Sequence, residues 1–522
     1  MPPTNTFRDR DQPAVVIGSG FGGLAAAIRL RAMGHPVTVF ESGNQPGGRA
    51  RVFEDQGFTF DAGPTVITAP YLFEELFEMC GRDHRDYFDL VPVDPFYRVV
   101  FDDGEAFDYV GEEDRLLDQI RRFNPEDVDG YQRMVAHAKS IFEVGYLGLA
   151  DKPFSKFGDM ARIIPDLVQL QAYKSVYGLV KRYIKDDRLR QVFTFEPLLV
   201  GGNPFRVPGI YLLIHWLERK WGVHFAMGGT TAIIKGMVRL LEELGVEVRL
   251  ECPVEQIEVD DEGRAEAVTL QSGERVACRF VVSNADPATV YTRLIPREKR
   301  RKHTDRSVAR KKYSMSLFVG YFGTRIQYPE LAHHTILLGP RYKELLTDIF
   351  DRKVLADDFS LYLHAPTRTD PSLAPPGHEA FYVLSPVPNQ RSGIDWSERA
   401  DEYMDRILTH LDGTLLPGLK DNLVSQMSVD PRYFEVGLRS YAGAAFGPEP
   451  VLTQSAWFRF HNESEDVGGL YFVGAGTHPG AGVPGVLSTA KVMERVVPRP
   501  EVPLPLPAAL PASSMRPARK AG

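Results

Sequence analysis

The stretch AVVIGSGFGGLAAAIRLRAMGHPVTVFE, residues 14–41, decides the fold. AVVIG predicts a buried strand, and FGGLAAAIRLRAMG predicts a helix that ends at Gly34. A second buried strand, PVTVFE, follows at once. A strand, a helix and a strand within about thirty residues form a parallel β-α-β unit, which predicts a doubly wound sheet.

The turn between the first strand and the helix carries a dinucleotide-binding pattern. GSGFGG, residues 18–23, matches G-x-G-x-x-G, and Glu41 ends the next strand. Gly18 makes the tight turn, Gly20 admits a pyrophosphate close to the backbone, and Gly23 lets the helix pack on the strand. Glu41 can bind both hydroxyls of a ribose, and its charge disfavours a 2′-phosphate, so FAD or NAD fits better than NADP. The alternative is a glycine turn that binds no ligand.

Two further segments near the N-terminus favour FAD over NAD. ESGNQPGGRA, residues 41–50, contains Gly48 and Arg49, and GFTFDAGPT, residues 57–65, adds a loop where backbone can approach a ligand. A nicotinamide site needs no such extension. An extended flavin dinucleotide would use Gly48 and Arg49 beneath its phosphate–flavin portion. Alternatively, PGGR forms only a type II turn with a solvated arginine.

A third glycine-rich segment stands near the other end of the chain. GAGTHPGAGVPG, residues 474–485, follows the apolar run LYFV and precedes a predicted helix. Its glycines remove side chains where a flat ring could lie against backbone, and we expect a packing or capping role for His478. The helix would point free N–H groups at the pyrimidine edge of a flavin, where negative charge gathers on reduction. We therefore predict one FAD site made from both ends of the chain.

The FAD contacts predicted from these three segments are Gly18, Ser19, Gly20, Phe21, Gly22, Gly23, Glu41, Ser42, Gly48, Arg49, Thr65, Gly474, Gly476, Gly482, Val483, Pro484, Gly485 and Val486.

Composition is that of a globular protein with two or three domains. The 522 residues are 43% hydrophobic and 25% charged, with a net charge of −8, so nothing global predicts nucleic-acid binding. The chain start has no apolar stretch behind basic residues, and no segment reaches the roughly 18 to 20 continuous apolar residues that span a bilayer. We expect a cytoplasmic protein whose membrane contact is peripheral.

No metal site is expected. The three cysteines lack the paired spacing of zinc, haem or thiol redox sites, and four histidines are scattered along the chain without a partnered ligand. These residues are Cys80, Cys252, Cys278, His215, His333, His334 and His364.

Several strings resemble the superfamily of FAD-dependent amine oxidases and carotenoid desaturases, and more narrowly the bacterial and fungal type of phytoene desaturase. The resemblance covers residues 13–497. Its strings are AIRLRAMGHPVTVFE (27–41), PGGRARVFEDQGFTFDAGPTVIT (46–68), RRFNPEDVDGYQRM (121–134), LLVGGNPF (198–205), SLYLHAPT (360–367), EPVLTQSAWFRFHN (449–462) and VGAGTHPGAGVPGV (473–486).

The resemblance implies an α/β fold with a split Rossmann-like FAD-binding domain, an inserted α+β substrate domain and a helical membrane-associating region. The expected division is 13–80 for the first part of the FAD-binding domain, 81–240 for a mixed strand and mainly helical substrate and membrane region, 241–300 for return strands of the FAD-binding domain, 301–465 for the substrate domain, 466–497 for the last part of the FAD-binding domain, and 498–522 for a disordered Pro/Ala-rich tail.

The resemblance also implies three site residues. In this superfamily the adenine often packs near a backbone valine in the central β segment, and Val254 in CPVEQI matches that position. Asp159 and Arg162, in SKFGDMARIIP, match positions proposed for acid–base or charge-stabilising work. Because they stand three apart, on a helix they would share a face and could pair. The alternative is a surface ion pair without a catalytic role.

The activity implied by the resemblance is repeated desaturation of 15-cis-phytoene to neurosporene or lycopene. Each step removes a hydride, which the flavin accepts, and a proton from adjacent allylic carbons. A hydrocarbon offers no hydrogen bonds, so we expect a long apolar tunnel. No second dinucleotide motif or CxxC is present, which favours a quinone or oxygen as electron acceptor. The number of steps, the product isomer and the oligomeric state are left open.

Alternatives within the same class are a carotenoid isomerase, a ketolase or a desaturase of another polyene. An amine oxidase would need an aromatic cage over the flavin, and the strings do not resemble that branch. A non-catalytic prenyl-binding escort protein shares the superfamily fold but could dispense with the flavin segments, which are intact here.

Three segments could contact the inner face of the cell membrane. Residues 160–184 and 207–225 mix apolar and aromatic residues with cations, as interfacial helices do. Residues 297–312 contain nine Lys/Arg, which would favour anionic head groups. The alternative for each is a core helix or a solvated loop.

Overall fold

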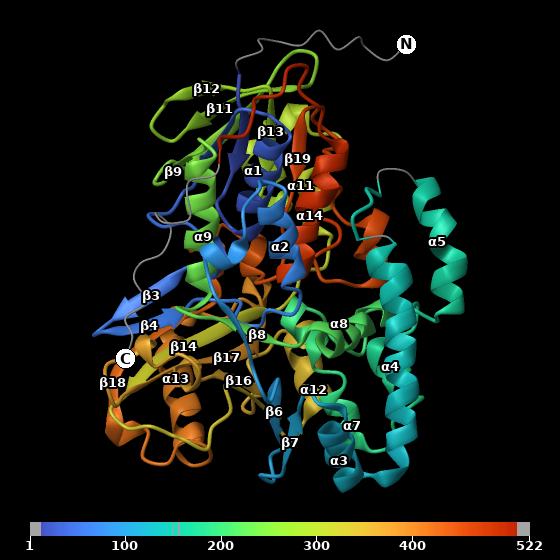
Figure 1. Cartoon of the computed structure of the whole chain (residues 1–522), viewed down its shortest axis with the longest axis vertical. Helices are drawn as coiled ribbons and strands as arrows, with labels where there is room; N and C mark the ends of the chain where they lie inside the picture. Colours follow the sequence, from blue (N-terminus) through green and yellow to red (C-terminus); the bar gives the residue numbers. More distant parts are fainter. Residues whose placement is uncertain (1–11, 149, 155–156, 509–522) are drawn as a thin grey trace.

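A five-stranded parallel sheet forms the centre of one domain (Figure 1). Its strands come from three separate parts of the chain, and its order is β19 (Leu470–Phe472), β13 (Phe280–Ser283), β1 (Ala14–Ile17), β2 (Val37–Phe40) and β9 (Glu247–Arg249). The computed structural model describes residues 12–508 except 149, 155 and 156. We call this unit the split domain.

Four helices cover one face of this sheet. Every residue of α1 from Phe21 to Arg31 is buried, which is the pattern of a helix enclosed on all sides. Arg29 on α1 pairs with Glu75 and with Glu494, each at 2.8 Å, and so joins two of the other helices. The helices are α1 (Phe21–Ala32), α2 (Tyr71–Glu78), α9 (Thr230–Glu243) and α14 (Val483–Val496). Helix α9 packs on α1, although the expected division placed most of it within 81–240.

A three-stranded antiparallel sheet covers the opposite face. It consists of β10 (Val254–Val259), β11 (Ala265–Leu270) and β12 (Arg275–Ala277). Val15 and Val281 of the central sheet pack against it in one apolar cluster. The turn sequences DDEG and QSGE join its strands, as hairpin turns do.

A seven-stranded mixed sheet forms the core of a second unit, which we call the inserted domain. Only the β15–β6 pair is parallel. Alternate side chains face opposite ways, so Phe318 and Val383 pack on α13 (Trp396–Asp412), while Val319 and Leu384 face a cavity. The order is β18 (Leu423–Val429), β14 (Ser316–Thr324), β17 (Glu379–Val387), β16 (Leu361–His364), β15 (His334–Leu337), β6 (Tyr97–Val100) and β7 (Ala106–Tyr109).

Helices form the outer side of the inserted domain (Figure 1). Helix α4 packs against α8, and α5 lies at the periphery. Among the described residues, no helix combines the length and the apolar composition that crossing a bilayer requires. The helices are α3 (Glu113–Phe123), α4 (Val128–Phe142), α5 (Phe157–Gln169), α6 (Val176–Val180), α7 (Asp187–Val192), α8 (Leu213–Trp221) and α12 (Tyr342–Thr347).

A few short elements lie outside these sheets and helix groups. They are the hairpin β3 (Val52–Asp55) and β4 (Phe58–Asp61), the pair β5 (Leu90–Pro92) and β8 (His224–Ala226), and the short helices α10 (Pro287–Thr289) and α11 (Asp305–Ala309).

The first part of the tail, which we expected to be disordered, packs on the split domain. The Leu504 N–H donates to the Gly34 carbonyl at 2.9 Å. Buried Arg31 donates to the carbonyls of Leu504 and Pro505 at 3.1 and 2.6 Å. The expectation was wrong for residues 498–508, because this proline-rich segment presents carbonyls that buried arginines can use. Residues 509–522 lie outside the described part.

Candidate active site

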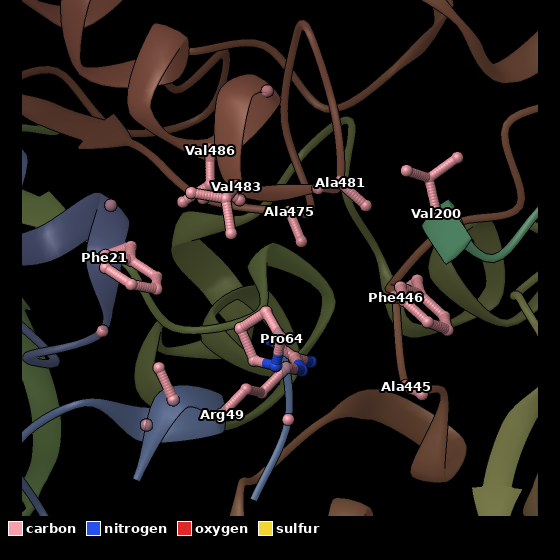
Figure 2. Close-up of a pocket in the computed structure, with 18 of the residues that line it drawn as sticks. Phe21, Arg49, Pro64, Val200, Ala445, Phe446, Ala475, Ala481, Val483 and Val486 are labelled. Atoms are coloured by element: carbon pink, nitrogen blue, oxygen red, sulfur yellow. The ribbon is translucent and has the colours of Figure 1, made fainter. Parts of the chain in front are cut away.

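A cavity of about 800 Å³ lies between the split domain and the inserted domain. The turn after β1, the loop around Arg49 and the start of α14 form one part of its wall. Figure 2 shows Phe21, Arg49 and Pro64 facing Val483 and Val486 across this space. The inward face of the seven-stranded sheet and the segments 195–200 and 210–218 form the rest. Ligand sites have this size and usually lie between domains.

Most of the predicted FAD contacts line this cavity. Three of them are not in its lining but lie directly behind it. These are Ser19, Gly23 and Gly476. A Cβ at Gly23 would lie 1.9 Å from the Gly18 carbonyl oxygen, and one at Gly476 would lie 2.3 Å from Pro287. Both glycines therefore permit backbone packing that brings their neighbours to the cavity.

The carboxylate of Glu41 is fixed at the end of β2. Its Oε2 accepts hydrogen bonds from the backbone N–H and the hydroxyl of Ser19, at 2.8 and 2.7 Å. Its Oε1 accepts one from the Gly43 N–H at 2.8 Å. Val254 lies nearby in the wall, because the Cys252 N–H donates to the Glu41 carbonyl at 2.8 Å. A carboxylate fixed at this strand end is suited to bind ribose hydroxyls, with adenine beside Val254.

Arg49 supplies a positive charge to the cavity wall. Its Nη2 donates to the Ser440 hydroxyl at 2.7 Å, while its buried Nε has no hydrogen-bond partner among the described residues. Burial lowers the pKa of Arg49, and the carboxylate of Asp286 opposes that shift. A buried guanidinium with an unused donor in a cavity wall fits a phosphate or a polar ring edge.

The N-terminus of α14 forms the opposite wall. Gly482 precedes the helix with φ of 88°, a left-handed conformation that glycine adopts without strain. Pro484 lies in the first turn, where its missing N–H costs nothing. The remaining free N–H groups and the helix dipole favour negative charge in front of Val483 and Gly485, which both line the cavity. His478 lines the cavity too, and its ring packs edge-on to Phe154 with centroids 4.7 Å apart.

Gly18, Gly20, Glu41, Arg49, Val254 and the start of α14 together form a cradle for a dinucleotide. The cradle fits an extended dinucleotide whose ring system reaches toward an apolar space. A cradle of this kind suits the dinucleotide of a flavin-dependent oxidoreductase.

Comparison with known proteins leads to the same class. The family model of flavin containing amine oxidoreductases matches residues 21–492. The chain is 51% identical to the lycopene-forming phytoene desaturase of Pseudescherichia vulneris, over 91% of this chain and 97% of that one. It is 44% identical to the neurosporene-forming phytoene desaturase of Rhodobacter capsulatus, over 94% and 95% of the two chains. The chain therefore belongs to the flavin containing amine oxidoreductases and, within them, to the bacterial phytoene desaturase family.

Solved structures share the fold at low sequence identity. An oxidoreductase from Methanosarcina mazei matches with a TM-score of 0.62 and 18% identity, over 92% of this chain and 98% of that one. Putrescine oxidase matches with a TM-score of 0.60 and 16% identity, over 93% and 97% of the two chains. The family is flavin containing, and the cofactor of this protein is FAD, which supplies a hydride acceptor when bound.

The inserted domain gives the cavity an apolar wall. Aliphatic side chains line it from β14, β15 and β17 and from the segments on the helical side. They include Leu198, Leu199, Ile210, Ile214, Leu217, Leu317, Val319, Ile336, Leu338 and Leu384. Such a wall suits a substrate that offers no hydrogen bonds.

Three histidines that are scattered along the sequence meet behind this wall. The register of β15 and β16 places His334 opposite His364, and His364 Nε2 lies 3.1 Å from His333 Nε2. The hydroxyl of Tyr362, in the cavity wall, lies 2.6 Å from His334 Nδ1 and 2.8 Å from the Thr65 hydroxyl. Burial lowers the pKa of His333 to about 3, so this ring is neutral. Sequence spacing gave no signal of the group, because a strand pairing creates it.

A second polar group, also not predicted, lies in the wall itself. Glu196 and Glu218 both line the cavity and are at most 1% exposed. His215 and Tyr97 contact them. These four residues come from β6, α8 and the segment between α7 and α8, so no local pattern reveals them.

The structure does not bring Arg162 to the cavity. Asp159 and Arg162 belong to α5, at the periphery of the molecule, and Arg162 is exposed. The Asp159 side chain lies outside the described part of the chain. A catalytic role for this pair stays a prediction.

Proposed function

We propose that this protein is an FAD-dependent desaturase of 15-cis-phytoene that forms neurosporene or lycopene. The observation that supports it best is the continuity of the dinucleotide cradle with an apolar cavity. Each step breaks two C–H bonds on adjacent allylic carbons: a hydride leaves with one electron pair, a proton leaves from the neighbour, and the remaining pair forms the new double bond. The wall orients the chain and excludes water.

The test is incubation of purified protein, FAD and phytoene in liposomes, with products separated by chromatography. Loss of phytoene and appearance of neurosporene or lycopene are expected, since relatives with both products are similar to this chain. Unchanged phytoene with FAD bound would contradict the proposal. A polyene that changes only in isomer or oxygen content would favour the isomerase or ketolase alternative.

We also propose peripheral attachment to the inner face of the cell membrane through α5 and its surroundings. Ile164 and Val168 on α5 are 45% and 56% exposed. Helix α5 contacts the turn Ala456–Phe458, where Phe458 is 39% exposed. The Lys311 ammonium lies beside this turn, 3.5 Å from the Phe458 carbonyl oxygen. Apolar side chains beside cations are typical of surfaces that bind anionic lipid.

The other two segments expected at the membrane have different surroundings. In residues 207–225, helix α8 turns His215, Leu217 and Glu218 inward, so this segment is a core helix that forms cavity wall. In residues 297–312, Arg300 is buried and pairs with Asp305 at 2.5 Å, and Lys302 pairs with Glu465. Intramolecular partners therefore neutralise part of this basic run.

Asp159 and Arg162 stay proposed as an acid–base or charge-stabilising pair, and a lipid quinone or oxygen as the electron acceptor. A quinone in the same liposomes should sustain turnover without oxygen. If only oxygen sustains it, the quinone is not the acceptor.

A further inference from the structure

Two carboxyl groups are buried in the part of the cavity wall that lies among the aliphatic side chains. Glu196 begins a short 3₁₀ helix, Glu196–Val200, and Glu218 lies on α8. They are 1% and 0% exposed, and both line the cavity. Burying a carboxylate costs several kcal/mol unless it is paired, so such groups in an apolar wall call for a reason beyond packing.

The contacts around the pair fix where protons can lie. His215 Nε2 lies 2.9 Å from the Phe193 carbonyl oxygen, which can only accept, so Nε2 carries a hydrogen. In neutral His215 the Nδ1 lone pair then faces Glu196 Oε1, 2.9 Å away. A proton on Glu196 or on His215 Nδ1 would make this contact favourable.

The second carboxyl group is held through one of its two oxygens. The hydroxyl of Tyr97 donates to Glu218 Oε1 at 2.7 Å. Glu218 Oε2 is buried and has no hydrogen-bond partner among the described residues. An unpaired oxygen on a side chain that lines a substrate cavity is unusual, because buried polar atoms are nearly always hydrogen-bonded.

The charge on this group is limited by the proximity of its members. One carboxylate oxygen of Glu196, one of Glu218 and one ring nitrogen of His215 all lie within 4.8 Å of one another. Burial raises the pKa of Glu196 to about 8, and burial together with Glu196 raises that of Glu218 well above its usual range. Two adjacent carboxylates resist simultaneous ionisation, so we treat the group as one acid that holds at most one negative charge.

We propose that Glu218 is the catalytic residue that accepts the proton lost from the substrate, and that Glu196 and His215 position it and share its proton. The inference rests on the proposed function. In each step a hydride leaves one carbon with its electron pair, for which FAD would supply the acceptor. The adjacent C–H bond breaks, its proton binds Oε2 of the ionised Glu218 carboxylate, and its electrons form the new double bond. The negative charge of the group also stabilises positive charge that develops on the polyene.

The main test is single-turnover reduction of FAD by phytoene in liposomes, followed by flavin absorbance. Glu218→Gln keeps the shape but removes the base, so the rate should fall about 100-fold or more, the usual loss for a general base. FAD content and the product isomer should not change. Lys220→Gln, an exposed change on the same helix, is the matched control and should keep the normal rate.

The rival base is Asp159, and the pH profile separates the two. Glu196→Gln removes the neighbour that raises the pKa of Glu218, so the rise of the rate with pH should move to lower pH. Glu218→Gln should abolish that rise, whereas Asp159→Asn should keep it. A Glu218→Gln enzyme with normal rate and pH profile, or an Asp159→Asn enzyme that alone loses both, overturns the inference.

The protonation of the buried carboxyl groups can also be measured without substrate, so this test does not depend on turnover. Infrared spectra of the FAD-loaded protein at neutral pH should show a protonated, buried carboxyl band that shifts in D₂O and weakens in Glu196→Gln. Absence of this band contradicts the inference even if Glu218→Gln fails to fold. If the wild type shows the band but phytoene does not reduce FAD, the proposed function fails instead.

Discussion

At the scale of single residues, Gly482 is where the FAD cradle meets the inserted domain. Its φ of 88° suits only glycine, and a Cβ there would lie 3.1 Å from Val200 in the cavity wall. Gly482→Val should therefore abolish FAD binding while leaving the protein folded, because the strain falls on a loop. The measurement is flavin absorbance per protein, with circular dichroism for folding.

Gly413→Ala is the control for this prediction. Gly413 ends α13 with φ of −78°, and a Cβ there would meet only ordinary contacts. This variant should keep its flavin. Full flavin content in Gly482→Val would show that the loop does not hold the cofactor.

The buried carboxyls also predict how stability depends on pH. Glu196 has a pKa of about 8 in the folded protein against an ordinary 4.5, because burial disfavours its charged form. Between these values the folded chain keeps a proton that the unfolded chain has lost. The free energy of unfolding should therefore fall as pH rises from about 5 to about 8.

Urea unfolding of the FAD-loaded protein at several pH values tests this dependence. Glu196→Gln should reduce the slope without removing it, because burial also raises the pKa of Glu218 and raises that of Asp61 to about 7. Glu298→Gln, at an exposed position, should leave the slope unchanged. Equal slopes in wild type and Glu196→Gln would show that Glu196 is ionised in the folded state.

The residues predicted from sequence are those whose role is local. Gly18, Gly20 and Glu41 act through a turn and a strand end that follow each other along the chain, so their spacing carries the signal. Glu196 and Glu218 acquire their role only when α8 packs beside the segment that precedes it in the chain. Their sequence neighbours give no sign that they are buried.

At the scale of elements, α5 and α8 show why amphipathic character alone is ambiguous. Both segments mix apolar, aromatic and basic residues, and both suggested an interfacial helix. Helix α8 buries His215, Leu217 and Glu218, whereas Ile164 and Val168 of α5 are exposed. The two helices differ in burial because α8 packs against α4. Such packing depends on the tertiary structure and not on the local sequence.

The exposed face of α5 leads to a prediction on membrane binding. The double variant Ile164→Gln, Val168→Gln removes two apolar side chains of the proposed contact, each worth about 1.5 to 3 kcal/mol if fully buried in lipid. Binding to anionic liposomes should weaken about tenfold or more. Sedimentation with the liposomes measures it.

Val436→Gln serves as the control, since Val436 is 75% exposed on a different segment. It should bind as the wild type does. If the double variant and this control bind equally, α5 is not the membrane contact.

At the scale of the whole molecule, the C-terminal segment holds the split domain together. Arg31 and Arg82 donate to carbonyls of Leu504, Pro505 and Ala508. A chain that stops after Pro498 leaves these guanidiniums without those acceptors, and hydrogen bonds to charged groups contribute about 1.5 to 3 kcal/mol each. We expect the free energy of unfolding to drop by about 4.5 to 9 kcal/mol.

A chain that stops after Ala508 is the matched control, because it keeps every contact named above. Urea unfolding followed by flavin fluorescence compares the two. Equal midpoints would mean that residues 499–508 do not stabilise the fold.

The five-stranded sheet has a consequence for synthesis. Strand β19 and helix α14, at residues 470–496, complete a site that begins at Gly18. During translation the first β-α-β unit emerges early, but it cannot close around a nucleotide until nearly the whole chain has left the ribosome. Cofactor loading is therefore a late event of maturation, and a chain that stops before α14 is expected to be colourless. The yellow colour of a preparation reports not only that FAD is bound but also that synthesis has passed α14.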